Sequence, residues 1–251
     1  MTGSKRRNTI MSYCTGRVVV RLVLPAMLLF AGPPAAALNI ALVMVELSPG
    51  KKVMSIRVLN DSNDAISFQA ETLSWQQIAG VDHYAQTQDL LVAPAIFNIA
   101  PGASQILRVT LRKPPVTDVE LAYRLILEDV TEESSLQPGT VKLRFRHNLP
   151  LFAAPHQPPL VNSQWRRCAA PANKACIELN NQGNRRVRLT GVAVEGPNWR
   201  KDIRGGATVL AGSSRQWFFD LEPGQSAALR VIPTSDIGDI LKAVTLPGPK
   251  S

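Results

Sequence analysis

From residue 38 onward the chain is a succession of short segments in which apolar and polar residues alternate, with no long helical periodicity. A period of two predicts β-strands that bury one face. Clusters of Pro, Gly, Asn and Asp separate the segments about every 8–12 residues, a spacing typical of immunoglobulin-like β-sandwiches. The strands expected in the first half are 38–47, 53–59, 66–75, 90–94, 96–99, 105–111, 121–130 and 139–151.

A Pro-rich segment, 153–159, predicts a linker, and the alternating pattern then restarts. The strands expected after it are 174–180, 185–194, 216–221 and 227–232. We therefore predict an all-β protein with two immunoglobulin-like β-sandwich domains, residues 38–155 and a smaller one over residues 156–251. A faint internal echo supports this division, because a Pro-Gly turn precedes an Arg-Val pair in each half (Pro101-Gly102 and Pro223-Gly224).

The first 37 residues have the order of a secretory signal peptide. Five cations and no acid precede or flank an apolar run at 22–31, and a small-residue segment ends at Ala37, after which we expect cleavage. The alternative is a membrane anchor, but the uncharged run is about half of the ~20 residues that a spanning helix needs. The sequence thus predicts export to the periplasm without stable membrane insertion.

Charge changes the picture little. The whole chain carries a formal charge of +9, and without residues 1–37 it has 23 cations against 19 acids, a net charge of +4. Nucleic-acid binding usually requires a more concentrated basic face, so we expect no nucleic-acid partner. We also expect no enzyme and no cofactor, because His83, His147 and His156 lack metal-ligand spacing and no Gly-x-Ser-x-Gly or phosphate-loop motif occurs.

Two cysteines, Cys168 and Cys176, remain once residues 1–37 are removed. An even pair in an oxidising compartment, closing a turn-like segment with Pro and Asn, predicts a structural disulfide. A redox-active pair would more often be spaced Cys-x-x-Cys, and a metal site would need further ligands.

The segment 141–146 alternates large apolar residues with cations. In a strand the two sets point to opposite faces. The ordinary interpretation is a core-facing side and a solvated side. The functional interpretation is an edge strand whose unpaired backbone and apolar row bind a partner's strand. The apolar members are Val141, Leu143 and Phe145, and the cationic members are Lys142, Arg144 and Arg146.

Four blocks in order, at residues 56–60, 93–109, 123–130 and 149–155, resemble the PapD-like periplasmic pilus chaperones of the chaperone–usher pathway. They cover most of the first predicted domain, while the second domain matches loosely. The Leu-Pro-Leu-Phe sequence at 149–152 is similar to the divergent branch that serves archaic or spore-coat-like pili.

The resemblance implies two immunoglobulin-like domains set at an angle, with a cleft between them. It implies that Val141, Leu143 and Phe145 are the donor-strand residues that complete an unfinished pilus or fimbrial subunit, which an outer-membrane usher then receives. An uncapped apolar edge also makes the free protein a candidate self-capping homo-oligomer.

One departure from the better-known members concerns the anchor of the subunit's C-terminal carboxylate. The family's Arg and Lys positions align with Met44 and Pro150 here, and neither side chain carries a charge. Arg124 is the first substitute, because it lies in the strand expected beside the donor strand. Arg146 and Arg108 are weaker candidates, and each of the three is otherwise a solvated surface charge.

The alternative function is a secreted immunoglobulin-like binding or adhesive module without chaperone activity. A pilus subunit would typically be a single domain with a donor tail, whereas here the expected first strand leads directly into the sandwich. A free module would have no reason for a long edge strand with an apolar row.

Overall fold

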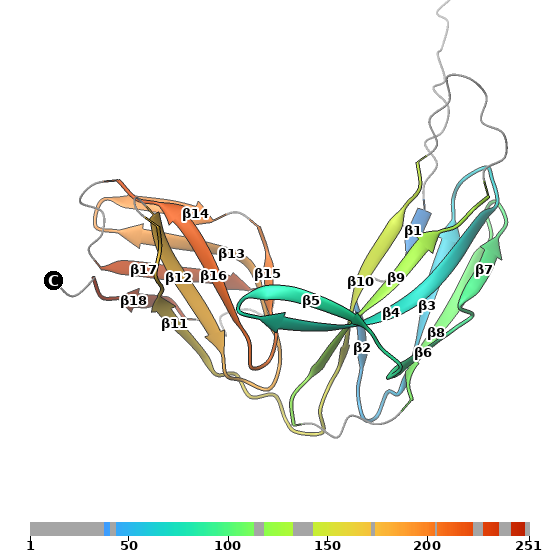
Figure 1. Ribbon diagram of the computed structural model, residues 1–251, viewed down its shortest axis with the longest axis horizontal. Coiled ribbons are helices and arrows are strands. Elements are labelled where there is room, and N and C mark those ends of the chain that lie inside the picture. The colour runs from blue at the N-terminus through green and yellow to red at the C-terminus, as the bar shows by residue number, and fades with distance from the viewer. Residues whose placement is uncertain are drawn as a thin grey trace, which may run out of the picture. The chain divides into compact units, whose positions relative to one another are not determined.

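The computed structural model describes residues 38–40, 44–112, 118–132, 143–171, 174–203, 205–222, 228–235 and 242–248. Every regular element in these ranges is a β-strand, labelled β1 to β18, which confirms the all-β prediction (Figure 1). Within the same ranges, a search for helices long and apolar enough to span a membrane finds none.

The first ten strands form two sheets that face each other. One sheet has the order β1-β3-β8-β6, and the other has the order β2-β10-β9-β4-β5 with β7 also paired to β4. Figure 1 shows β10, β9 and β4 running side by side. The strands are β1 (Leu38–Ile40), β2 (Val45–Leu47), β3 (Val53–Asn60), β4 (Ile66–Ile78), β5 (Val81–Gln86), β6 (Leu90–Ala93), β7 (Ile96–Ile99), β8 (Ser104–Leu111), β9 (Leu121–Asp129) and β10 (Arg146–Ala153).

Alternation along these strands sends every second side chain into the space between the two sheets. Ile56 of β3, Leu107 of β8 and Leu125 of β9 are fully buried there. Burying one such side chain contributes about 1.5–3 kcal/mol, so this shared core holds the two sheets together.

The remaining strands form a second sandwich with its own core. Its sheets have the orders β11-β12-β16 and β14-β13-β17-β18, with β15 also paired to β13. Ile177, Leu179 and Val194 are fully buried between them. The strands are β11 (Ser163–Arg167), β12 (Lys174–Asn181), β13 (Val187–Gly196), β14 (Trp199–Ile203), β15 (Ala207–Val209), β16 (Ser214–Asp220), β17 (Leu229–Ser235) and β18 (Val244–Leu246).

A buried asparagine closes the same kind of corner in each sandwich. Asn60, at the end of β3, donates from Nδ2 to the carbonyls of Asp64 and Ile99, at 2.7 and 2.9 Å. Asn181, at the end of β12, donates from Nδ2 to the carbonyls of Arg185, Val209 and Leu210. Both asparagines therefore satisfy backbone groups of a turn and of a second strand end that no ladder reaches.

The glycine opposite each asparagine is the other half of this corner. The N–H groups of Gly102 and Gly212 donate to the carbonyls of Asn60 and Asn181, each at 2.9 Å. Their φ values are 68° and 70°, a left-handed conformation that favours glycine. The structural counterpart of Pro101-Gly102 is thus Ala211-Gly212, whereas Pro223-Gly224, which suggested the echo in the sequence, lies outside the described residues.

Several strands differ from the expected ones. β4 continues to Ile78 and pairs with β5 in a hairpin, where the sequence indicated only a polar stretch. β11 and β14 were not expected either. The strand expected at 139–151 is observed as β10 from Arg146; residues 143–145 lie outside the strand, and 139–142 lie outside the described residues.

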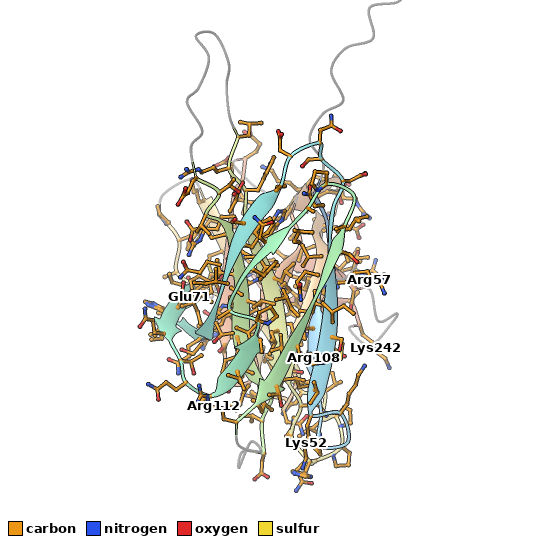
Figure 2. The ribbon with its side chains drawn as sticks, turned by 90° about the vertical axis from the view of Figure 1, so that its right-hand side faces the viewer. Lys52, Arg57, Glu71, Arg108, Arg112 and Lys242 are labelled. Carbon is orange, nitrogen blue, oxygen red and sulfur yellow. A yellow bond between two sulfur atoms is a disulfide. The ribbon has the colours of Figure 1, made fainter. Side chains whose placement is uncertain are left out.

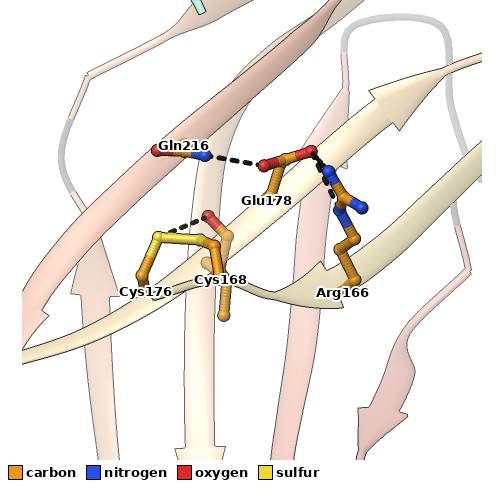
Figure 3. The surroundings of a disulfide bond; sticks show 6 residues. Arg166, Cys168, Cys176, Glu178 and Gln216 are labelled. Atoms are coloured by element: carbon orange, nitrogen blue, oxygen red, sulfur yellow. Dashed lines mark hydrogen bonds and ion pairs between the residues drawn. A yellow bond between two sulfur atoms is a disulfide. The ribbon is translucent and has the colours of Figure 1, made fainter. Parts of the chain in front are cut away.

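The structure pairs the two predicted cysteines. A disulfide joins Cys168 to Cys176, near the start of strand β12, with the Cα atoms 5.0 Å apart (Figure 3). Beside it, the Glu178 carboxylate accepts hydrogen bonds from Arg166 and from Gln216 Nε2 at 2.7 Å. Burial raises the pKa of Glu178, but the hydrogen bonds from Gln216 and Arg166 outweigh burial and hold this pKa below its usual value.

Asn60→Ala tests the corner motif. Because it leaves several buried backbone groups without a partner, we expect a loss of about 2–3 kcal/mol in the free energy of unfolding, measured by denaturant titration. Asn98→Ala is the matched control, since the exposed Asn98 amide donates only to Ser67 Oγ. An equal effect of the two substitutions would contradict the structural role of Asn60.

Candidate functional site

The outer edge of β10 has a partner strand along only part of its length. β9 pairs with β10 from Arg146 to Ala153, whereas β2 pairs in parallel only with residues 151–153. No described residue pairs with the outer edge of Arg146–Pro150. This stretch can therefore accept a strand from a partner.

The register shows which backbone groups face outward. Asp129 N–H donates to the Phe145 carbonyl at 3.0 Å, so residue 145 and every second residue after it face β9. The N–H and C=O groups of Arg146 and Asn148 consequently face the open edge. Pro150 also faces outward but has no N–H, so continuous strand pairing ends there.

The apolar row predicted for the donor strand lies at the start of this edge. Leu143 is 69% exposed and Phe145 is 43% exposed, and they precede β10 directly. In the same alternation His147 stacks on Phe145, with ring centroids 6.1 Å apart, and Leu149 packs against the core. Val141, the third predicted donor residue, lies outside the described residues.

His147 is the one polar member of this row. Its Nε2 is buried without a hydrogen-bond partner among the described residues. Burial lowers the pKa of His147, so the neutral ring is favoured in the folded protein. The row therefore has a predominantly apolar character at neutral pH.

The opposite face of the same sheet carries Arg124 on an aromatic surface. Arg124 lies opposite Pro150 in the β9–β10 register. Its guanidinium carbon is 3.8 Å from the centroid of Trp75 and 5.6 Å from that of Tyr84. No described carboxylate forms an ion pair with Arg124, so its charge is held by cation–π contacts alone.

A second arginine, Arg186 of the second sandwich, was not predicted from the sequence. Its Nη2 is 3.5 Å from Met44 Sδ, and its guanidinium stacks on Phe152 at 3.8 Å. It therefore brings a cation to the residue that aligns with the family's first anchor. Glu46 and Glu120 already pair with it, the latter at 2.6 Å, so Arg186 is neutralised.

The other two predicted anchors lie elsewhere. Arg146 is on the same sheet face as Arg124 but is exposed and 3.8 Å from Glu128. Arg108 belongs to β8 of the other sheet, where Figure 2 shows it on the same side as Arg57 and Lys52. Of the three predicted arginines, Arg124 is the one that lies on β9 opposite Pro150 and has no ion pair with a described carboxylate.

Acidic and metal-ligating groups form no alternative centre in the parts of the chain that the structure describes. No group of three or more His, Cys, Asp or Glu residues there could hold a metal ion. The hydroxyl of the buried Tyr123 donates a hydrogen bond to Asp89 at 3.1 Å. Burial is the larger cause, and the negative charge of Asp89 the smaller one, that raises the pKa of Tyr123. This pair fastens β9 to the start of β6.

Comparison with solved structures identifies chains of similar fold. A chain of the CsuC–CsuE chaperone–tip adhesion subunit pre-assembly complex, from the archaic chaperone–usher Csu pili of Acinetobacter baumannii, has a TM-score of 0.64 and 18% identity, covering 84% of this chain and 98% of its own. The YadV chaperone has a TM-score of 0.60 and 16% identity, covering 83% and 99%. A chain of the Salmonella enterica SafA pilin–SafB chaperone complex has a TM-score of 0.59 and 18% identity, covering 86% and 98%.

At these identities the structural likeness establishes the fold of two immunoglobulin-like sandwiches. None of the curated proteins matches the sequence. Residues 37–159, which span the first sandwich and the open edge of β10, match the family of pili and flagellar-assembly chaperones through its PapD N-terminal domain. Residues 37–159 therefore carry the N-terminal domain of the PapD-like family of pilus chaperones.

Proposed function

We propose that this protein is a periplasmic chaperone that captures incomplete pilus subunits by lending them the open edge of β10. The observation that carries the proposal is the combination of an unpaired strand edge at Arg146–Pro150 with exposed Leu143 and Phe145 in line with it. The match of residues 37–159 to the pilus-chaperone family supports the same role.

The physical logic is that two incomplete surfaces cover each other. A subunit that lacks a strand exposes an apolar groove and unpaired backbone groups, both of which favour aggregation. The outward N–H and C=O groups of Arg146 and Asn148 would supply the missing ladder. Leu143 and Phe145 would fill the groove, because every second side chain of the strand points to the same face while its backbone pairs with the subunit.

Arg124 is the carboxylate anchor in this proposal. A subunit strand that pairs in parallel with the open edge of β10 would end at Pro150, because proline has no N–H group to continue the backbone hydrogen bonds. Its terminal carboxylate would then lie next to Arg124, whose in-plane N–H groups are suited to bidentate binding. Arg186 is the weaker choice since Glu46 and Glu120 already occupy it.

Two further steps belong to the proposal. The captured subunit would pass to an outer-membrane usher, and the same open edge would allow free molecules to cap each other as a homo-oligomer. Export through residues 1–37 would place the protein in the periplasm, with the linker at 153–159 dividing a domain over 38–155 from one over 156–251.

The alternative, a secreted binding module, predicts a different outcome in one experiment. The protein would be co-expressed in a periplasm with pilin-like proteins from the same genome and recovered by affinity pull-down. If the protein is a chaperone, a small β-rich partner should be recovered with it in stoichiometric amount. Recovery of the protein as a monomer without a partner would favour the secreted binding module.

Phe145→Glu tests the donor row in this assay. A carboxylate at that position would have to be buried unpaired in the subunit groove, so we expect recovery of the subunit to fall at least about tenfold. Ile106→Glu is the matched control, because Ile106 is 40% exposed on β8 of the other sheet. Normal capture by folded Phe145→Glu protein would remove β10 as the donor.

Arg124→Gln tests the anchor separately. Losing the charge while keeping a polar side chain should weaken capture of a subunit with its native C-terminus by about five- to fiftyfold, measured as the dissociation constant. A subunit whose C-terminus is extended by Gly-Ser-Gly-Ser should show no such difference between the wild type and Arg124→Gln. Equal affinity of both proteins for the native subunit would exclude Arg124.

A further inference from the structure

Asp82, on β5, collects hydrogen bonds from three side chains of the β4–β5 hairpin. Its Oδ1 accepts from Trp75 Nε1 at 3.0 Å and from Gln77 Nε2 at 2.8 Å, and its Oδ2 accepts from the Tyr84 hydroxyl at 3.5 Å. The carboxylate is thus committed to these donors and forms no ion pair with a cation in the described chain.

The two aromatic rings that Asp82 contacts are also the two rings that carry Arg124. Trp75 and Tyr84 lie opposite each other in the β4–β5 ladder, with ring centroids 6.3 Å apart. The Arg124 guanidinium stacks over both of them. A hydrogen bond that fixes the tilt of the rings therefore also fixes the plane of the guanidinium.

We infer that Asp82 is a positioning residue for Arg124, which it holds in place through the rings of Trp75 and Tyr84, ready to bind a partner's terminal carboxylate. The carboxylate part rests on the proposed function; the positioning part concerns the free protein alone.

Side-chain chemistry favours an arrangement in which Asp82 orients the rings and Arg124 remains available for an anion. An arginine side chain loses considerable rotamer freedom when it binds, and immobilising it beforehand reduces that cost. Stacking uses the faces of the guanidinium; Nε is buried, and the N–H groups of the two Nη atoms at the edge remain for an anion. A direct Asp82–Arg124 ion pair would instead have occupied that edge, as Glu46 and Glu120 occupy Arg186.

Gln77 in turn orients Asp82. Its Nε2 donates both to Asp82 Oδ1 and to the Thr208 carbonyl, and its Oε1 accepts from Leu210 N–H at 2.9 Å. With both ends of the amide bonded, the donor to Asp82 has a single orientation. The hairpin thus has a connected polar network beneath the aromatic surface.

The positioning claim is tested on the free protein by NMR of the Arg124 Nε–Hε group. Ring currents from Trp75 and Tyr84 shift this signal, and we expect Asp82→Ala to move it most of the way to the position of an unstacked arginine. The signal of exposed Arg57, on the other sheet, should not move. An unchanged Arg124 signal in folded Asp82→Ala protein would overturn the inference whether or not a subunit is ever captured.

The binding claim is tested by a double-mutant cycle with the recovered subunit as probe. Asp82→Ala should weaken binding about five- to tenfold in the wild-type background and less than about twofold in the Arg124→Gln background. Asp82→Asn, which keeps one acceptor for Trp75 Nε1, should restore part of the affinity. Equal losses in both backgrounds would show that Asp82 acts on the fold and not on Arg124.

Phe145→Glu, measured in parallel, separates the two proposals. If Phe145→Glu abolishes capture while Asp82→Ala has no effect, the positioning inference fails and strand donation stands. If Phe145→Glu leaves capture intact, the proposed function fails, and the NMR result alone decides whether Asp82 positions Arg124.

Discussion

Backbone hydrogen bonding along the open edge of β10 is the constraint on which the site depends. A strand has two sides, and β9 satisfies only one side of Arg146–Pro150 in the described structure. Proteins usually protect such an edge with charge, with proline or by shortening it. Here Arg146 and Pro150 stand at its two ends, with the outward-facing backbone of Asn148 between them.

Two arginines lie on the aromatic rings of Trp75 and Phe152 at the outer face of the sheet, and they differ in whether a carboxylate neutralises their charge. The rings of Trp75 and Phe152 contact each other at a tilt, with centroids 5.8 Å apart, and Arg124 lies on the first and Arg186 on the second. Both cations gain from the ring faces, but only Arg186 has carboxylate partners. A partly buried cation without a carboxylate partner attracts an anion more strongly than a fully exposed one, because the effective dielectric around it is lower. This difference is why Arg124, and not the cation nearest Met44, is suited to a ligand.

Strand periodicity predicted most of the first sandwich, because strands follow from local alternation. The expectation that Arg124 lies in the strand next to the donor strand came from the family resemblance, and β9 does pair with β10. Strand periodicity did not predict the β4–β5 hairpin, because the apolar residues near its tip, Ile78 and Val81, are exposed and do not alternate with polar residues as in a half-buried strand. It could not indicate Arg186, which reaches Met44 across 142 positions of sequence. The true counterpart of Pro101-Gly102 was also missed, since Ala211-Gly212 shares the glycine, its backbone conformation and its hydrogen bond but lacks the proline.

The features that the sequence did not predict have a common physical cause, which also concerns how the side chains of a binding site can differ within one fold. Main-chain pairing and core burial tolerate many side chains, and folds with TM-scores near 0.6 persist here at 16–18% identity. A carboxylate anchor needs only a cation within reach of the end of the open edge, and a long guanidinium on a neighbouring strand meets that need as well as one on the donor strand. Placing it on β9 requires a support, since a guanidinium free in solvent would lose rotamer entropy on binding. The β4–β5 hairpin supplies Trp75, Tyr84 and Asp82 at that position. Under the proposed function, the hairpin and an anchoring Arg124 on β9 therefore depend on each other.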